Sequence, residues 1–495
     1  MKSLAELGLT AQGGGEVQIS GLAVDSREVK PGFLFAALPG SRVHGGEFIQ
    51  YALRMQAAAI LTDAEGAAIA ADALDASDAV LIIAQDPRQA LAQTASLWFG
   101  AHPATMVAVT GTNGKTSVAT FCRQIWEELQ IPGVNLGTTG VEGAWTHPLK
   151  HTTPEPITLH RVLAEAAQNG ITHAAMEASS HGLDQRRLDG VLLAAAGFSN
   201  FSQDHLDYHE TFEAYFAAKM GLFKRVLGDD GVAVVNLDDP KGLEVADICT
   251  GRGQEVVGVG RHRQARLRLT GQRFDATGQD LLFEWQGRSH QARLDLIGGF
   301  QAENVLLAAA LVISAGAEAA DVFEALPYLS TVRGRMQLAA TRENGAAVFV
   351  DYAHTPDAVE TALKAMRPHV MGRIIVIVGA GGDRDTAKRP LMGAAAAQNA
   401  DTVLITDDNP RSEDPASIRA AVMAGAITAG GTDSITEYGD RAEAILRAVD
   451  MLSAGDALLI AGKGHETGQT IGDTVLPFDD VEQASVAVAA LEGRI

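Results

Sequence analysis

The stretch from Met106 to Ser117 constrains the fold of this chain more than any other part of the sequence. Its first residues, Met106–Val109, form a short apolar run that predicts a buried strand. The strand ends at a glycine-rich turn, and residues 118–129 predict a helix. A turn in this setting can present backbone N–H groups to a phosphate, and the dipole at the start of the helix adds to the attraction. We therefore expect a phosphate-binding turn within a parallel α/β sheet.

The turn is followed by a lysine and a hydroxyl residue, Lys115 and Thr116. In phosphate-binding loops of this kind the lysine reaches the terminal phosphates and the hydroxyl joins the shell of a Mg²⁺ ion. The full Walker pattern has a glycine where Val109 stands, so only Gly-Lys-Thr and one upstream glycine are met. The alternative is an ordinary glycine-rich turn with a solvated lysine. The order of strand, turn and helix favours an ATP site, with these predicted contacts: Gly111, Thr112, Asn113, Gly114, Lys115, Thr116 and Ser117.

The chain is too long for one core, because single hydrophobic cores stop growing near about 250–300 residues. Its 495 residues predict three α/β domains, over residues 1–100, 101–331 and 332–495. In the central domain strand and helix patterns alternate, which predicts a parallel sheet covered on both faces. Residues 255–297 alternate apolar and polar side chains, which is typical of a small antiparallel annex.

Charge and cysteine content argue against several functions. The net charge of −22 disfavours a broad nucleic-acid surface, which needs clustered Lys and Arg. Cys122 and Cys249 are the only cysteines, so neither a disulfide framework nor a cysteine zinc site is indicated. No apolar run approaches the ~18 residues of a membrane span, and residues 1–10 lack the pattern of a signal peptide. We therefore expect a cytoplasmic protein that binds no nucleic acid and does not insert into a membrane.

Three features of the central domain suggest chemistry, and each has a plain structural alternative. Glu177 ends a predicted strand, where ligands of open α/β sheets bind, so its carboxylate is a candidate Mg²⁺ ligand or else a capping or surface glutamate. Residues 204–209 hold two Asp and two His, which fit a metal or phosphate contact and fit a solvated loop equally well. Lys219 lies in a predicted alanine-rich helix, where a lone lysine is usually exposed.

Three successive strands of the third domain each run into polar residues. The strand 374–378 is followed by Gly379–Asp385, the strand 402–406 by Asp407–Arg411, and the strand 457–461 by Gly462–Glu466. Polar loops are normal, but this concentration at strand ends favours a binding face of a doubly wound domain.

Several motifs occur in an order that resembles the Mur ligases, the ATP-dependent amide-forming enzymes of peptidoglycan precursor synthesis. These motifs are Thr110–Thr116, Glu177–Gly182, Asp204–Asp207, Asn304, Asp351–His354 and Gly462–Glu466. The loop of that family also lacks the Walker glycine. The resemblance implies an N-terminal UDP-binding α/β domain, a central P-loop-type parallel-sheet ATPase domain and a C-terminal Rossmann-like, doubly wound domain that binds the amino acid.

Within the family, Asp25–Arg27 and Glu177–Leu183 are most similar to the third ligase of the series. That similarity implies UDP-N-acetylmuramoyl-L-Ala-D-Glu as the acceptor, with phosphorylation of its γ-carboxylate by ATP and attack of an amine on the acyl phosphate. By the same resemblance Lys115, Lys219, Glu177 and His205 are the catalytic residues, and Asn304, Asp351 and His354 contact the nucleotide. Its implied Mg²⁺ ligands are Thr116, Glu177, His205 and Lys219, with Lys219 carried as a carbamate. Its implied contacts to the UDP-sugar peptide are Val24, Ser26, Ser41, Arg42, Val43, Thr152, Thr153, Ser179, Gln185 and Arg187.

The run Asp408–Arg411 is similar to the family's meso-diaminopimelate motif. Family members that add L-lysine usually lack the arginine of this motif. Diaminopimelate differs from lysine by a distal carboxylate and its amine, and a guanidinium grips a carboxylate with two hydrogen bonds. The residues expected at this amino acid are Arg384, Asp408, Asn409, Pro410, Arg411, Gly462 and Glu466.

Three alternatives remain at this stage. The same fold with L-lysine as substrate is the nearest, and Arg411 argues against it. A folylpolyglutamate synthetase shares the loop chemistry, but the long N-terminal domain and the run Glu177–His181 disfavour it. A non-catalytic nucleotide binder is disfavoured by the presence of four residues: Lys115, Glu177, His205 and Lys219. We expect a monomer.

Overall fold

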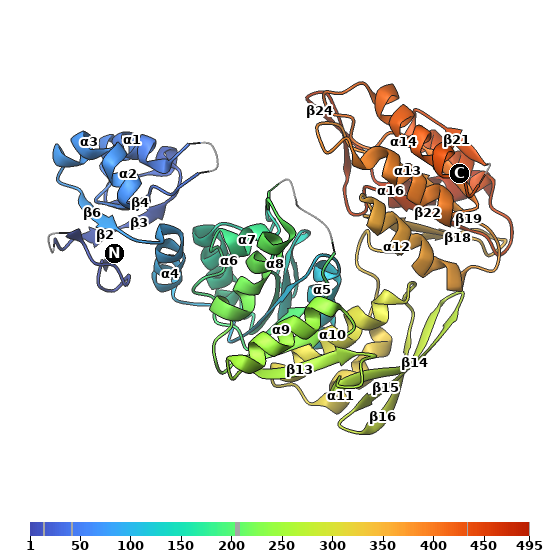
Figure 1. Ribbon diagram of the computed structural model, residues 1–495, viewed down its shortest axis with the longest axis horizontal. Helices are drawn as coiled ribbons and strands as arrows, with labels where there is room; N and C mark the ends of the chain where they lie inside the picture. Colours follow the sequence, from blue (N-terminus) through green and yellow to red (C-terminus); the bar gives the residue numbers. More distant parts are fainter. Residues whose placement is uncertain (13–14, 41–42, 203–207, 433, 495) are drawn as a thin grey trace. The chain divides into compact units, whose positions relative to one another are not determined.

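The computed structural model describes residues 1–12, 15–40, 43–202, 208–432 and 434–494 (Figure 1). The chain forms two compact units, one of Met1–Arg268 with Leu306–Val322 and one of Leu269–Val305 with Phe323–Ile495. Three predicted site residues, Ser41, Arg42 and His205, lie outside the described residues. Among the residues that are described, no helix has the length and apolarity to cross a membrane.

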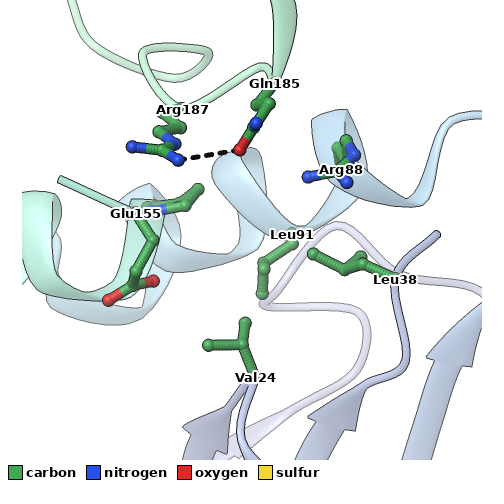
Figure 2. A pocket seen from close by; sticks show the side chains of 8 residues that line it. Val24, Leu38, Arg88, Leu91, Glu155, Gln185 and Arg187 are labelled. Carbon is green, nitrogen blue, oxygen red and sulfur yellow. Dashed lines mark hydrogen bonds between the residues drawn. The ribbon is translucent and has the colours of Figure 1, made fainter. Parts of the chain in front are cut away.

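The first unit begins with a small parallel sheet in the order β3-β4-β5-β6. Apolar residues pack on both faces of this sheet in two separate clusters. Asp86 caps helix α4 by accepting from Gln89 N, and Pro87 takes the first helical position, where its missing N–H costs nothing. Leu91 of this helix lines a pocket together with Val24 and Leu38 (Figure 2). The elements are β1 (Lys2–Ser3), β2 (Gln18–Ile19), β3 (Gly21–Ala23), β4 (Phe33–Ala36), α1 (Ile49–Arg54), β5 (Ala59–Thr62), α2 (Ala64–Ile69), α3 (Ala71–Asp75), β6 (Val80–Ile83) and α4 (Pro87–Phe99).

The larger sheet of the first unit confirms the predicted alternation of strands and helices. Its parallel strands follow the order β13-β12-β11-β7-β10-β8, and β9 pairs antiparallel with β8 at the edge. The elements are β7 (Thr105–Thr110), α5 (Lys115–Glu128), β8 (Gly133–Gly137), β9 (Gly140–Gly143), α6 (Pro156–Gln168), β10 (His173–Glu177), α7 (Ser180–Asp184), β11 (Ala195–Phe198), α8 (Phe212–Gly221), a π-helix (Leu222–Val226), β12 (Val232–Asn236), α9 (Pro240–Gly251) and β13 (Glu255–Gly260).

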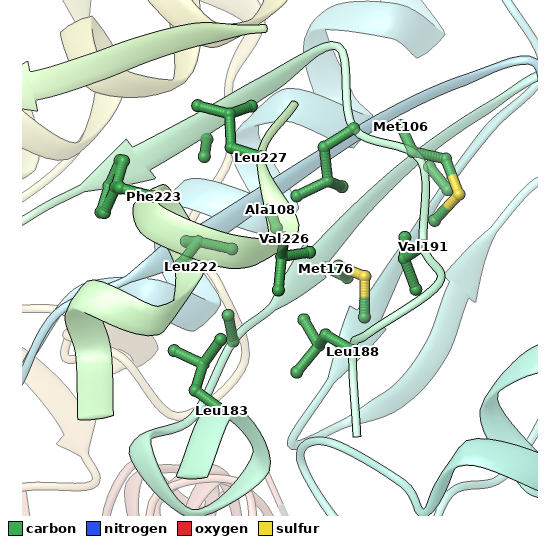
Figure 3. Close-up of a cluster of buried hydrophobic side chains, with 14 of the residues drawn as sticks. Met106, Ala108, Met176, Leu183, Leu188, Val191, Leu222, Phe223, Val226 and Leu227 are labelled. Carbon is green, nitrogen blue, oxygen red and sulfur yellow. The ribbon is translucent and has the colours of Figure 1, made fainter. Parts of the chain in front are cut away.

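The core of this sheet follows from the two-residue period of its strands. Met106 and Ala108 of β7 and Met176 of β10 point to one face, where Leu222 and Phe223 of the π-helix cover them (Figure 3). Val107 and Val109, on the opposite face, are also buried, which explains why the strand reads as a continuous apolar run. The rigid sheet fixes where each strand ends, and the polar residues lie at those ends.

Helix α5 begins at Lys115, three residues before the predicted start. Gly114 caps it with φ of 85°, a left-handed conformation that favours glycine. Thr116 and Ser117 therefore lie in the first helical turn, whose N–H groups have no partner within the helix.

The second unit contains the antiparallel pair β15–β16 and a doubly wound sheet. The prediction of an antiparallel annex over residues 255–297 is correct for this pair and wrong for the start of the range, because Glu255–Gly260 forms β13, which pairs parallel with β12 and with β14 (Leu267–Asp275). The doubly wound sheet has the order β17-β18-β22-β19-β20-β21, parallel apart from β17. Alternate residues of β19 enter the apolar clusters on its two faces, so all five are buried. The remaining elements are β15 (Gly278–Trp285), β16 (Arg288–Leu294), α10 (Phe300–Ser314), α11 (Ala319–Ala325), β17 (Gln337–Thr341), β18 (Ala347–Asp351), α12 (Pro356–Met366), β19 (Ile374–Val378), α13 (Lys388–Asn399), β20 (Thr402–Ile405), α14 (Pro415–Ala429), β21 (Ile435–Glu437), α15 (Arg441–Asp450), β22 (Ala457–Ala461), β23 (Gly468–Ile471), β24 (Thr474–Pro477) and α16 (Asp480–Leu491).

Candidate active site

The turn between β7 and α5 is shaped by contacts with the end of the neighbouring strand β11. Asn113 N donates to Asn200 Oδ1 (2.8 Å), and Ser199 Oγ donates to Asn113 O (2.6 Å). At Gly111, φ is 148° and a Cβ would lie 2.0 Å from Ser199 Oγ, so a side chain does not fit there. The turn thus needs glycine both for its conformation and for its close approach to β11.

Two lysines converge on one carbonyl of this turn. Lys115 Nζ donates to Gly111 O (2.9 Å) and to Thr112 O (2.8 Å), and Lys219 Nζ donates to Gly111 O (2.7 Å). Lys219 is 1% exposed, and its ammonium lies 4.4 Å from the centroid of the Tyr215 ring. Sequence spacing gave no sign of this burial, since a lone lysine in a helix is usually exposed. Two cations beside a turn of backbone N–H groups form a strong anion site.

Glu177 ends β10 beside the turn, as predicted, and it is 2% exposed. Its Oε2 accepts from Thr116 Oγ1 (2.9 Å) and its Oε1 from Thr138 N (2.8 Å). A Cβ at Gly137 would lie 1.9 Å from Glu177 Oε1, so a glycine on β8 makes room for the carboxylate. A carboxylate and a hydroxyl are hard oxygen donors of the kind that Mg²⁺ prefers, so these two residues fit that ion.

The rest of a Mg²⁺ shell would come from water and phosphate oxygens, as is usual for this ion. Within the described part of the chain no group of three or more His, Cys, Asp or Glu side chains is arranged to hold a metal. His205, predicted to bind a second ion, lies outside that part.

Predicted substrate residues from distant parts of the first unit line one pocket (Figure 2). Val24, Gln185 and Arg187 were predicted, whereas five lining residues were not: Leu38, Arg88, Leu91, Glu155 and Pro156. Arg187 Nη2 donates to Gln185 Oε1 (2.8 Å), and burial lowers the pKa of Arg187. Both Glu155 oxygens accept from backbone N–H groups at the start of α6, which occupies that carboxylate. The pocket therefore combines apolar walls with a guanidinium available to an anionic group.

Hydrogen bonds connect this pocket to Glu177. Arg187 Nη1 donates to Thr153 O (2.7 Å), and Thr153 Oγ1 donates to Glu177 O (3.0 Å). Ser179 Oγ donates to Thr153 Oγ1 (3.0 Å), and Thr138 and Thr152 share a hydroxyl hydrogen bond (3.0 Å). The structure thus brings together Thr152, Thr153 and Ser179, three of the residues predicted from resemblance.

Ser26 and Val43 were also predicted to contact the UDP-sugar peptide, and neither takes part in the hydrogen bonds described above. Ser26 begins a 3₁₀ helix, Ser26–Glu28, which Asp25 caps by accepting from Arg27 N (2.9 Å). Val43 is 53% exposed. Neither residue lines the pocket of Figure 2.

Tyr208 was missed by sequence reasoning. Its hydroxyl donates to Asp184 Oδ2 (2.9 Å) and accepts from Gln185 Nε2 (3.1 Å), and burial raises its pKa. It therefore fixes the orientation of the Gln185 amide, whose oxygen faces Arg187. Its position within the polar run 204–209 was the only signal in the sequence.

In the second unit, the loops after β20 and β22 meet through side chains. Asn409 Nδ2 donates to Glu466 Oε2 (2.9 Å), and Lys463 Nζ contacts the same oxygen at 3.2 Å. Gly462 has φ of 117°, and a Cβ there would lie 2.5 Å from Asp408 Oδ2. The strand ends predicted to form a binding face thus do adjoin.

Arg411 has a strained backbone, with φ of 51°. Its Nη1 donates to Gly382 O (2.7 Å), which joins its loop to the loop that carries Arg384. Ser412 Oγ donates to Asp383 Oδ1 (2.6 Å) between the same two loops. Arg384 is exposed and Pro410 is buried. Two guanidinium groups on adjoining loops can hold a carboxylate-bearing ligand.

One predicted nucleotide residue of the second unit also contacts these loops, because Gly462 N donates to Asp351 O (3.1 Å). Asp351 ends β18, and its carboxylate accepts from Met336 N (2.7 Å) and Ala353 N (2.8 Å), while burial raises its pKa. His354 Nδ1 lies 2.8 Å from Tyr352 O. Asn304 lies in α10, with its Nδ2 3.4 Å from Gln301 Oε1.

Three family models match most of the chain. They describe the Mur ligase family catalytic domain (residues 18–98), the Mur ligase middle domain (109–312) and the Mur ligase glutamate ligase domain (334–464). The chain belongs to the Mur ligase family. The resemblance and the three-domain α/β fold class expected from its motifs are thereby confirmed, whereas the domain boundaries and the roles of single residues stay predictions.

Relatives within the Mur ligases match along almost the whole chain. UDP-N-acetylmuramoyl-L-alanyl-D-glutamate--2,6-diaminopimelate ligase of Bradyrhizobium diazoefficiens is 49% identical over 96% of each chain. A solved structure of a ligase with that name is 33% identical, with a TM-score of 0.70 over 96% of this chain and 95% of the other. The MurF ligase of Thermotoga maritima in complex with ADP shares the fold, with 17% identity and a TM-score of 0.61 over 97% and 99% of the two chains. The Mur ligases are ATP-dependent, as expected for this chain.

Proposed function

We propose that this protein is the ATP-dependent ligase that joins meso-diaminopimelate to the D-Glu γ-carboxylate of UDP-N-acetylmuramoyl-L-Ala-D-Glu, forming ADP and phosphate. The observation that carries the chemistry is the glycine-rich turn with Lys115 beside it, one strand away from the buried Glu177, whose Oε2 accepts from Thr116 Oγ1. The substrates are those in the names of the relatives that match the whole chain.

The reaction activates a carboxylate in two steps. An oxygen of the γ-carboxylate attacks the γ-phosphorus of ATP, ADP leaves, and an acyl phosphate remains. The amine of diaminopimelate then attacks the acyl carbon, the amine loses a proton, and phosphate leaves. The ammonium of Lys115 and the N–H groups of the turn stabilise the charge on the transferring phosphoryl group.

Mg²⁺ is the proposed metal, and Thr116 and Glu177 are the residues that would hold it. When bound, the ion neutralises phosphate charge. His205 is the proposed ligand of a second ion. Lys219 is the proposed site of a carbamate, formed when its neutral amine adds to CO₂ and releases a proton, which replaces a cation with an anion that attracts the metal. Asn304, Asp351 and His354 are the proposed nucleotide contacts in the second unit.

Arg411 supports diaminopimelate over L-lysine as the acceptor amine. A guanidinium donates hydrogen bonds to the distal carboxylate of diaminopimelate, whereas the side-chain ammonium of lysine offers it no acceptor. Arg384 on the adjoining loop is the second proposed cation, and Glu466 with the backbone of Gly462 faces the amino group. The same fold acting on L-lysine is the second candidate.

The pocket of Figure 2 is the proposed site for part of the UDP-sugar peptide. Arg187 is placed to bind an anionic group there, and Val24 contributes an apolar wall. We also propose that the protein acts in the cytoplasm, where ATP and nucleotide-linked precursors are available, as a monomer that binds no nucleic acid.

Phosphate release from ATP and Mg²⁺ tests the proposal directly. Purified protein is given UDP-N-acetylmuramoyl-L-Ala-D-Glu with meso-diaminopimelate or L-lysine in parallel. Release with diaminopimelate alone is the expected result. Release with L-lysine and not with diaminopimelate would support the ligase reaction but overturn diaminopimelate as the proposed substrate. No release with either amino acid would overturn the proposed reaction.

A further inference from the structure

Lys463 lies after β22, and its side chain is 0% exposed. Burying an ammonium group is costly unless the group is paired and hydrogen-bonded, so its partners indicate what the lysine does. Sequence reasoning selected Gly462 and Glu466 on either side of it but gave Lys463 no role.

Among the described residues, the hydrogen bonds of this ammonium go to two loops and a hairpin. Lys463 Nζ donates to Gly468 O (2.5 Å), to Glu466 Oε2 (3.2 Å) and to Asn409 Oδ1 (3.3 Å). These three bonds use the three donors that a lysine has. The lysine has no donor left for a ligand, so any effect on a substrate passes through these partners.

The amide of Asn409 is fixed by the same cluster. Asn409 Oδ1 also accepts from Thr470 N (2.8 Å), and Asn409 is 6% exposed. Because two donors face Oδ1, the Nδ2 group must face Glu466, where it donates to Oε2 (2.9 Å).

Glu466 is therefore held through one oxygen only. Oε2 takes both Lys463 and Asn409, whereas Oε1 accepts no hydrogen bond from any residue that the structure describes. The Glu466 side chain is 34% exposed, so the carboxylate reaches solvent at the strand ends. One oxygen anchored and the other open is an arrangement suited to an external ammonium group.

We propose that Lys463 is a positioning residue, which holds Glu466 so that Oε1 accepts from an ammonium group of the amino-acid substrate. This inference rests on the proposed function, because it takes the loops after β20 and β22 as the amino-acid site. Without the lysine, Oε2 loses its cation, the Asn409 amide can turn over, and the carboxylate no longer has one defined direction.

Lys463→Met tests this, because methionine keeps a long unbranched stem and removes the charge. Steady-state kinetics are measured for each substrate, starting with the wild type and diaminopimelate. We expect KM for the amino acid to rise about 10-fold through loss of an oriented, charge-assisted hydrogen bond. KM for ATP and for the UDP-sugar peptide should stay within about twofold, since Lys463 touches neither proposed site. An equal rise in all three would overturn the proposal.

Arg373→Met is the matched control. Arg373 Nη2 pairs with Asp456 Oδ2 (2.7 Å), and these residues precede β19 and β22 at the ends opposite the loops. This variant also loses an ion pair of the same domain, yet it should leave the KM for the amino acid unchanged. A rise equal to that of Lys463→Met would indicate general loosening of the domain and overturn the proposal.

Glu466→Gln, alone and combined with Lys463→Met, separates positioning from packing. If Lys463 acts only through Glu466, the double variant has the same KM for the amino acid as Glu466→Gln. Effects that multiply would overturn the proposal. The double variant removes both charges together, so the comparison holds even if Lys463→Met does not fold.

The wild-type measurement keeps the two proposals apart. Wild-type turnover with another amino acid would overturn the proposed substrate, and the same variants would then test Lys463 with that amino acid. A wild type without turnover overturns the proposed reaction, and calorimetric binding of diaminopimelate to the wild type and to Lys463→Met then tests Lys463, whose role equal affinities would overturn.

Discussion

The proposed phosphate turn of the first unit and the proposed amino-acid loops of the second, which follow β19, β20 and β22, are built in different ways. The turn is one continuous run, Gly111–Ser117, and its contacts use mainly backbone groups such as Gly111 O and Asn113 N. The amino-acid loops come from three separate strand ends, and their contacts join side chains such as Asn409, Lys463 and Glu466.

This difference explains why the first kind of site leaves a recognisable pattern in the sequence and the second does not. A backbone-made site depends on conformation, so it needs glycines and a helix start at fixed spacing, and these can be read from the sequence. A side-chain-made site depends on which loops the sheet brings together, and no fixed spacing records that. The two regions should therefore respond differently to single substitutions.

Lys115→Met should have the largest effect. It removes the cation proposed to stabilise the transferring phosphoryl group, so kcat should fall by about 10³-fold while the fold is kept. Phosphate release and a thermal unfolding curve measure the two quantities. Lys241→Met, which breaks an ion pair with Glu244 on the same unit, should leave kcat unchanged. A fall of less than tenfold for Lys115→Met would mean that the backbone alone carries this site.

Arg411→Ala should affect the amino acid and spare the nucleotide. Loss of a charge-assisted contact should raise KM for diaminopimelate on the order of 50-fold, with KM for ATP unchanged. Initial rates at varied amino acid measure it. Arg367→Ala, which breaks a pair with Asp401 in the same unit, is the control. Equal changes in both KM values would contradict the separation of the two sites.

Tyr208→Phe should have a smaller effect, confined to the UDP-sugar peptide. It removes the hydroxyl that holds Gln185, so KM for that substrate should rise about fivefold with kcat nearly unchanged. Initial rates at varied UDP-sugar peptide measure it. Tyr51→Phe removes a hydroxyl from a residue that is 54% exposed and should change nothing. An unchanged KM for Tyr208→Phe would show that Gln185 is oriented by Arg187 alone.

Protonation of His160 should lower the stability of the fold in acid, and His160 should have no effect on turnover at neutral pH. Burial lowers its pKa from 6.5 to about 4, so the unfolded chain takes up the proton first as the pH falls. The free energy of unfolding should drop by about 1 kcal/mol at about pH 5.5 relative to neutral pH, and continue to drop toward the folded pKa. Urea unfolding at the two pH values measures this. His160→Leu should reduce the drop by that amount, and an equal drop in the variant would place the acid sensitivity elsewhere.

The sequence by itself determined the α/β class, the strand–turn–helix of the phosphate site and the placement of Glu177 at a strand end. These features depend on the apolar period of strands and helices and on the backbone needs of glycine, which are local properties. The motif order also sufficed to identify the family.

Only the tertiary structure decided which side chains meet. The burial of Lys219 beside Lys115, the hold of Tyr208 on Gln185 and the anchoring of Glu466 by Lys463 join residues that the sequence separates or leaves without a signal. Such contacts depend on how the strands pack and where their ends fall, and hydrophobic periodicity records that a residue is buried without recording which partner it meets.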